Sequence, residues 1–176
     1  MDQPGGRTAI VVPFDLPPAL EAIRRAHVDN AHLGIPAHVT LLFPFVRADR
    51  LVPADVDRAA AVLRGTAAFD VAFREARTFE PGPTEEGVVW LAPEPDGPFL
   101  HLTNGLAAAF PGYLPYEGLH DTVIAHLTLA DTGVDVAALV AAARPELPFE
   151  RRVEAAAVLI EDDAGGWRVA HELPLG

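Results

Sequence analysis

Two apolar segments of this chain carry the same four-residue pattern, histidine, any residue, threonine and leucine: residues 37–45, AHVTLLFPF, and residues 125–130, AHLTLA. Side chains two positions apart in an extended strand point to the same face of a sheet. His38 therefore projects beside Thr40, and His126 beside Thr128, while the apolar residues between them face the other way. Each segment is expected to present an imidazole and a hydroxyl on a strand whose other face is anchored in a core.

Paired histidines suit acid–base chemistry on a phosphodiester. Histidine titrates near pH 6.5, so one imidazole can hold a proton while a second one lacks it close to neutrality. The neutral ring accepts a proton from the attacking group, and the charged ring donates one to the leaving oxygen. Threonine hydroxyls can donate hydrogen bonds to the non-bridging phosphate oxygens. We predict that His38, Thr40, His126 and Thr128 are catalytic, with either histidine as the acid and no metal or other cofactor required.

Four His-x-Thr triplets occur in the chain, but only those at 38 and 126 continue into leucine within an apolar run. Chance predicts about 0.04 matches to this longer pattern in a chain with this composition. The triplet at His101 lies in an alanine-rich segment that is predicted to be helical. The triplet at His120 follows Tyr-Glu-Gly and is predicted to lie in a loop. The pair at 38 and 126 therefore carries the functional signal.

This pair of motifs resembles the 2H phosphoesterase superfamily, which is defined by two His-x-Thr/Ser motifs, and in particular its bacterial branch that is similar to 2'-5' RNA ligases. The resemblance extends over nearly the whole chain. It implies a bilobal α+β fold, in which two pseudo-symmetric lobes with antiparallel sheets flank a central cleft and the helices lie outside. It also implies a metal-independent site that acts on 2',3'-cyclic phosphates or 2'-5' phosphodiesters. Members often carry a basic or polar residue after the second motif, where this chain has Ala130 and Asp131.

The composition indicates a globular protein with a small substrate. Half of the 176 residues are apolar and 22% are charged, which is typical of one domain with a sizeable core. There is no cysteine, and the short apolar run near the start is too short for a signal peptide or a membrane span, so we expect a soluble cytoplasmic protein. The formal charge of −12 disfavours a long polyanion. We expect a nucleotide or short RNA as the substrate, no DNA or membrane partner, and a monomer.

Three further residues are candidates for substrate binding. Tyr116 lies in an aromatic loop before the second motif, where it could stack on a base or simply pack locally. Phe43 follows the first motif, although most phenylalanines in such an apolar run belong to the core. Arg47 is close enough in sequence to meet a phosphate, although most arginines at such positions are solvated.

The hydrophobic pattern predicts the elements that position these residues. Strands are expected at residues 8–14, 37–46, 68–79, 88–92, 125–130, 149–161 and 167–173, and helices at 19–28, 53–63, 99–110 and 134–143. The strand and helix order of the first half recurs in the second, with one His-x-Thr motif at the equivalent strand of each. We therefore predict a single domain, 1–176, with one lobe at about 1–92 and another at about 98–176, possibly exchanging strands. The segment 93–98, rich in proline and acidic residues, is the predicted link between them.

Two other functions remain compatible with the sequence. The same fold can serve as a nucleotide-binding or RNA-end-binding module without turnover. Alternatively, His120, Asp121 and His126 can be read as ligands of a metal-dependent hydrolase, although an isolated His-Asp pair is a weak signal for such a site.

Overall fold

A computed structural model describes residues 5–79, 87–115, 122–131 and 135–176 of the chain. Its strands form one eight-stranded antiparallel sheet in the order β6-β3-β4-β5-β2-β1-β7-β8. The strands are β1 (Thr8–Phe14), β2 (Ala37–Leu42), β3 (Phe69–Phe79), β4 (Val88–Glu94), β5 (Leu127–Ala130), β6 (Phe149–Val153), β7 (Ala155–Glu161) and β8 (Trp167–Pro174). The predicted α+β class is confirmed.

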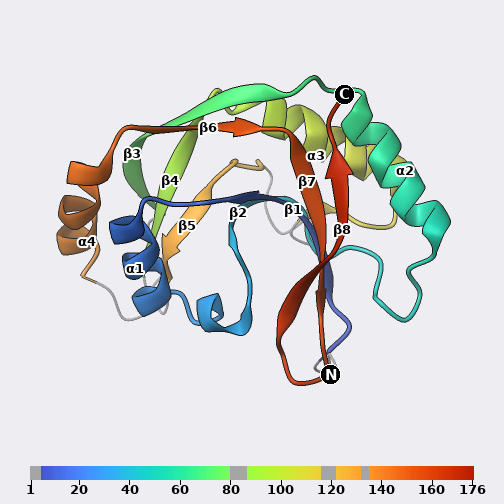
Figure 1. Ribbon diagram of the computed structural model, residues 1–176, viewed down its shortest axis with the longest axis horizontal. Coiled ribbons are helices and arrows are strands. Elements are labelled where there is room, and N and C mark those ends of the chain that lie inside the picture. The colour runs from blue at the N-terminus through green and yellow to red at the C-terminus, as the bar shows by residue number, and fades with distance from the viewer. Residues whose placement is uncertain (1–4, 80–86, 116–121, 132–134) are drawn as a thin grey trace.

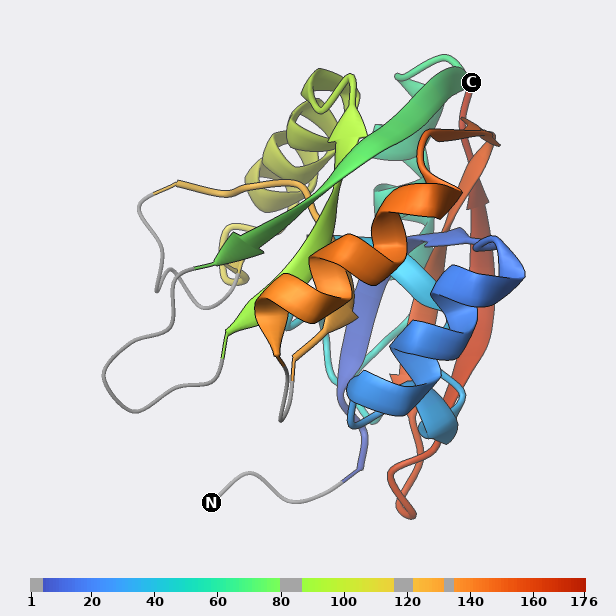
Figure 2. The same cartoon turned by 90° about the vertical axis from the view of Figure 1, so that its left-hand side faces the viewer.

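Helices cover one face of this curled sheet in two pairs (Figures 1 and 2). The described helices are α1 (Pro18–His27), α2 (Pro53–Arg64), α3 (Gly97–Ala109) and α4 (Val136–Ala143). α1 packs beside α4 and against β5, whereas α3 packs beside α2 and against β2. Three of these helices begin with proline in the first turn, a position where the missing N–H costs nothing.

The two halves of the sheet are related by an approximate twofold pattern around the central strands β2 and β5. The helix that follows β1 covers β5, and the helix that follows β4 covers β2. One half of the sheet contains strands from both ends of the chain, because β1 and β2 adjoin β7 and β8, whereas the other half contains the middle strands β3, β4, β5 and β6. The sequence limits of the two lobes stay a prediction.

Four predicted elements differ from the structure. The strand expected at residues 149–161 is two strands, because the chain bends at Glu154 and passes from β3, the partner of β6, to β1, the partner of β7. The link expected at 93–98 is shorter, since β4 continues to Glu94 and α3 begins at Gly97. Both motif strands are also shorter than predicted: β2 ends at Leu42, and β5 begins only at Leu127. The turn predicted at 81–87 falls largely outside the described residues.

Candidate active site

The central pair of strands brings the two His-x-Thr motifs together. Val39 of β2 pairs with Leu127 of β5 in an antiparallel ladder. One residue further along in each direction, this register sets His38 opposite Thr128 and Thr40 opposite His126. Side chains that are directly opposite in such a ladder lie about 4.5–5.5 Å apart at Cβ. Each imidazole therefore neighbours the hydroxyl of the other motif as well as that of its own.

The alternation of side chains along the strands places the motif histidines and threonines on one face of the sheet and the core residues on the other. Val39 and Leu127 are fully buried on the face that the helices cover, together with Leu41 and Leu129. The histidines and threonines of the motifs are half-buried on the opposite face, which the helices leave open. Burial of four aliphatic side chains fixes the register of these two strands, because a slip by one residue would turn the motif side chains into the core.

Both imidazoles are anchored in the same way. Nδ1 of His38 lies 2.8 Å from the carbonyl oxygen of Pro36, and Nδ1 of His126 lies 2.7 Å from that of Ile124. A carbonyl oxygen only accepts, so Nδ1 must carry the hydrogen in each ring. This hydrogen bond favours the tautomer with the hydrogen on Nδ1, in which the neutral ring can accept a proton at Nε2 and the protonated ring can donate one from it.

The surroundings of His38 favour its neutral form. Burial lowers the pKa of His38, and the hydrogen bond to Pro36 opposes this effect. The positive charges of Arg24 and of protonated His126 lower the pKa further. At neutral pH, His38 therefore presents an unprotonated Nε2, as a general base requires.

His126 occupies different surroundings, in a corner of aromatic rings. Its ring centroid lies 5.2 Å from that of Phe79 and 6.0 Å from that of Trp90, with nearly perpendicular ring planes. Phe79 and Trp90 stack on each other at 4.8 Å. Aromatic faces attract cations, so this corner is compatible with an imidazolium.

A hollow of about 140 Å³ adjoins His38 on the side of α1; we name it the Arg24 hollow. His38 and Thr128 line it together with Arg24 and Asp131, which agrees with the cross-strand register. The guanidinium of Arg24 is almost fully buried and donates to the carbonyl oxygen of Ile35 at 3.1 Å and to the carboxylate of Glu21 at 3.0 Å. Burial raises the pKa of the Asp131 carboxyl in the same hollow.

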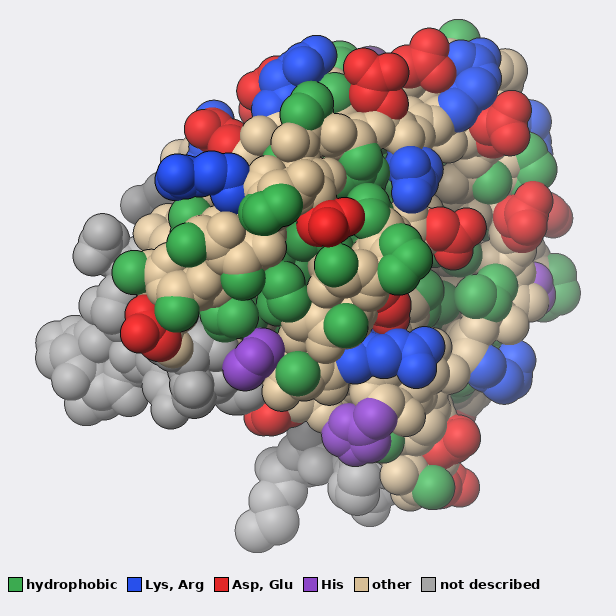
Figure 3. Space-filling model, turned by 60° about the vertical axis from the view of Figure 1, so that its left-hand side comes forward, with side chains coloured by type: hydrophobic (Ala, Val, Ile, Leu, Met, Phe, Trp, Pro, Cys, Tyr) green, Lys and Arg blue, Asp and Glu red, His purple; other side chains and the backbone are tan. Residues whose placement is uncertain are grey.

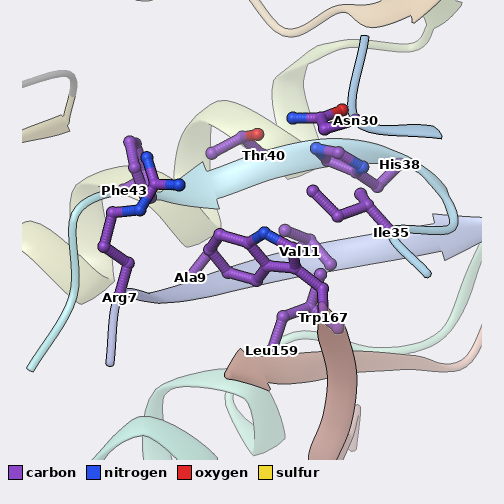
Figure 4. Close-up of a pocket in the computed structure, with 10 residues that line it drawn as sticks. All are labelled: Arg7, Ala9, Val11, Asn30, Ile35, His38, Thr40, Phe43, Leu159 and Trp167. Atoms are coloured by element: carbon purple, nitrogen blue, oxygen red, sulfur yellow. The ribbon is translucent and has the colours of Figure 1, made fainter. Parts of the chain in front are cut away.

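A second hollow, of about 230 Å³, extends from His38 and Thr40 towards β8; we name it the Trp167 hollow (Figure 4). Its other lining residues are Arg7, Ala9, Val11, Asn30, Ile35, Phe43, Leu159 and Trp167. Phe43 and Trp167 pack at its edge against a small apolar cluster that is separate from the main core. The hollow therefore joins the motif residues of β2 to an aromatic surface.

The remaining predicted site residues lie in different places. Phe43 lines the Trp167 hollow, as a substrate-binding residue would. Arg47 does not line either hollow: it donates to the carbonyl oxygen of Gly5 at 3.2 Å and pairs with Asp49 at 3.4 Å. Tyr116, His120 and Asp121 lie outside the described residues. His101 is exposed on α3, as its helical context predicts.

Two residues near the site escaped the sequence analysis. Arg24 lies four residues after the buried Leu20, on the inward stripe of α1, and an arginine at such a position is the signal that points to it. Trp167 begins a strand at the far end of the chain, and no local pattern connects it to the first motif.

Neither a metal cluster nor a membrane helix appears in the part of the chain that the structure describes. Within it, no group of three or more His, Cys, Asp or Glu side chains is arranged to hold a metal ion. None of the helices seen there combines the length and the apolar character needed to cross a bilayer.

The curled sheet and its central pair of anchored histidines define a phosphoesterase scaffold of the 2H type. The chain belongs to the 2'-5' RNA ligase superfamily, whose family model matches residues 12–165. No curated protein matches the sequence significantly.

Solved structures share this fold at low sequence identity. The protein TT0787 of Thermus thermophilus is 22% identical, with a TM-score of 0.62 over 96% of this chain and 97% of its own. LigT of E. coli, solved with 3'-AMP, is 18% identical, with a TM-score of 0.52 over 99% of both chains. LigT has also been solved with ATP, at 19% identity and a TM-score of 0.52 over 97% of this chain and 98% of its own. These similarities establish the common architecture.

Proposed function

We propose that this protein is a metal-independent phosphoesterase that opens 2',3'-cyclic phosphates or cleaves 2'-5' phosphodiesters in nucleotides or short RNA. The observation that carries the proposal is the matched pair of imidazoles, one on β2 and one directly before the adjacent strand β5, each held through Nδ1 by a carbonyl oxygen two residues earlier. Each motif also carries a threonine two residues after its histidine, and His38 and Thr128 line one hollow, which supports a shared site for both motifs.

In the proposed mechanism, His38 is the base and His126 is the acid. Nε2 of neutral His38 takes the proton of the attacking hydroxyl or water, whose oxygen then forms a bond to phosphorus. Nε2–H of protonated His126 gives its proton to the ribose oxygen as the bond from that oxygen to phosphorus breaks. The Thr40 and Thr128 hydroxyls donate to the non-bridging oxygens, on which charge builds in the transition state. The lowered pKa of His38 supports this division of roles.

The charge distribution supports a small substrate. At least eight of the 13 basic side chains, all of them arginines, lie within 4.0 Å of a carboxylate. On the face shown in Figure 3, basic and acidic side chains are interspersed and form no continuous basic stripe. Long RNA is bound mainly through its phosphates, which need such a stripe. LigT, a protein of the same fold, has been solved with single nucleotides.

The test is hydrolysis of the four 2',3'-cyclic nucleotides in excess chelator by the wild type and by the His38→Ala and His126→Ala variants. We expect turnover in chelator, with a loss of roughly 10²–10⁴-fold in each variant, the usual contribution of a general acid or base. His101→Ala is the matched control, because it removes an exposed histidine from another His-x-Thr triplet. Losses below tenfold at both motif histidines would contradict the mechanism. Nucleotide binding without any turnover would favour a binding module instead.

A further inference from the structure

The two hollows named above meet at His38. One of them is lined by Thr128 and the other by Thr40. Of the residues that the structure describes, two line both hollows: His38 itself and Asn30. A phosphate that accepts hydrogen bonds from both threonines, as proposed, must lie where the two hollows meet. Asn30 is therefore the further side chain that borders the expected position of the phosphate.

The carboxamide of Asn30 has hydrogen-bonding groups that the fold does not use. Its Nδ2 carries two hydrogens, and its Oδ1 is an acceptor. The side chain is exposed, it does not cap the short helix η1 (Ala31–Leu33) that follows it, and it makes no hydrogen bond within the described part of the chain. Figure 4 shows it beside the imidazole of His38, with Thr40 further along β2. Both polar groups of the amide are available to a ligand.

The segment that carries Asn30 is anchored on both sides. Val28 and Ala31 are buried, and the N–H group of Ala31 donates to the carbonyl oxygen of Val28 at 3.1 Å. Directly after the second motif strand, the N–H group of Asp131 donates to the carbonyl oxygen of His27 at 2.9 Å. These contacts hold the backbone of Asn30 relative to the second motif. A donor that is held in place before the substrate binds needs little reorganisation during the reaction.

A glycine anchors the far end of the same turn to β8. Gly34 has φ of +91°, and a Cβ atom at this position would lie 2.5 Å from the carbonyl oxygen of Trp167. The turn before β2 can therefore pack against the start of β8 only because residue 34 has no side chain. The chain from Asn30 to the first motif is thus held at both of its ends.

The chemistry of the junction favours the amide nitrogen over the amide oxygen as the contact to substrate. The non-bridging oxygens of a phosphodiester are anionic and only accept hydrogen bonds, so they attract Nδ2–H and repel Oδ1. The nearest buried cation is already occupied: Arg24 donates to Glu21 at 3.0 Å and to the carbonyl oxygen of Ile35 at 3.1 Å. A neutral amide can supply a further donor at the phosphate without burying another charge.

We infer that Asn30 is a catalytic residue, whose Nδ2–H donates to a non-bridging phosphate oxygen together with the hydroxyls of Thr40 and Thr128. This inference rests on the proposed function and adds a third donor to it, from outside the two motifs. Negative charge builds on the accepting oxygen in the transition state, so the hydrogen bond is stronger there than in the bound substrate.

The experiment measures kcat/KM on a 2',3'-cyclic nucleotide for three variants. Asn30→Ala should lower it roughly 10- to 150-fold, the usual contribution of one hydrogen bond to a charged group. Asn30→Asp has nearly the same shape but no Nδ2–H and an added negative charge, so its loss should be at least as large. Asp29→Ala is the matched control, because Asp29 is the exposed neighbour in sequence and lines neither hollow; it should behave as the wild type.

Wild-type activity in Asn30→Ala would overturn the inference and leave the two-histidine mechanism standing. Wild-type activity in Asn30→Asp would also overturn it, since the amide would then act as an acceptor. The thermal midpoints of all variants should match that of the wild type, because the Asn30 side chain is exposed and makes no hydrogen bond with the described residues.

Binding of inorganic phosphate separates this inference from the proposed function. If the wild type hydrolyses no cyclic nucleotide, the proposed function fails, and the contact is tested by isothermal titration calorimetry with phosphate alone. Asn30→Ala should then weaken phosphate binding about fivefold or more, and Asp29→Ala should not. Equal phosphate affinity in the wild type and Asn30→Ala, or no binding by the wild type, would refute the contact itself.

Discussion

Replacing Arg24 with methionine tests the electrostatic origin of the proposed base. Arg24 shares a hollow with His38, and its positive charge is one cause of the lowered pKa of His38, after burial. Methionine is an uncharged side chain of roughly similar length, so the burial of the imidazole should change little while the positive charge is lost. The pKa of His38 should then rise. Because the base must be unprotonated to act, the acid limb of the kcat/KM profile should move to higher pH, and activity at low pH should fall.

The substitution also weakens the fold, and the structure indicates by how much. Arg24 is almost fully buried, but the side chain of its partner Glu21 is 27% exposed. Removing one member of a fully buried ion pair costs about 3–5 kcal/mol, because the other charge is left uncompensated. Water reaches Glu21, and the carbonyl of Ile35 also loses its donor, so we expect a loss of about 1–3 kcal/mol in the free energy of unfolding.

Glu21→Gln is the matched control for this loss of stability. It breaks the same ion pair and should destabilise by a similar amount, but it leaves the charge of Arg24 beside His38. The assay is kcat/KM on a 2',3'-cyclic nucleotide from about pH 5 to about pH 9, with urea unfolding of each variant measured alongside. The acid limb should move to higher pH in Arg24→Met and should not do so in Glu21→Gln. An acid limb at the wild-type pH in Arg24→Met, or an equal shift to higher pH in both variants, would refute the reasoning.

Three further predictions follow from single contacts. Gly34→Ala should lower the thermal midpoint more than Gly165→Ala, because both positions have positive φ, at a cost of about 1–2 kcal/mol, but only at Gly34 does the new Cβ meet another atom. Arg7 holds the pKa of Glu161 below its usual 4.5, so this ion pair stabilises the fold above about pH 4.5. Its contribution is lost as the pH falls through the lower pKa of the folded state. In urea unfolding, the free energy of unfolding of Glu161→Gln should therefore fall less between neutral and acidic pH than that of the wild type. Thr128→Val should lower kcat/KM about 10²-fold and Thr128→Ser much less, since only valine lacks the hydroxyl; equal losses would assign threonine a packing role.

Local elements of the fold were predictable from sequence because they depend on local chemistry. The strand at 8–14 and the helix starting at Pro53 match the structure at those positions, since proline, capping residues and apolar runs act within a few residues. The order of the eight strands was not predictable, because pairing between distant segments leaves no local pattern. The clearest case is 149–161, whose uninterrupted strand-like character conceals a bend that transfers the chain between the two halves of the sheet.

The candidate site likewise contains residues that could be predicted from the sequence and residues that could not. Its histidines and threonines could be predicted because a repeated four-residue pattern within one chain is rare by chance, and alternation then places them on one face. The place of Trp167 beside His38 could not be predicted, since the hollow that both residues line forms only when β8 pairs with β7 and the turn at Gly34 packs against it. Arg24 is an intermediate case: its position on the inward stripe of α1 is visible in the sequence, but its approach to His38 is a tertiary contact.

The approximate symmetry of the scaffold raises the question of how two equivalent histidines could take the opposite roles that we propose for them. Their own strands, neighbouring hydroxyls and Nδ1 anchors are the same, so the motif cannot distinguish them. The difference must come from side chains that break the symmetry. A buried arginine disfavours a proton on His38, whereas two stacked aromatic rings beside His126 are compatible with a cation. Exchanging the proposed roles would therefore require changes around the motifs, at positions such as Arg24 and Trp90, and no change within them.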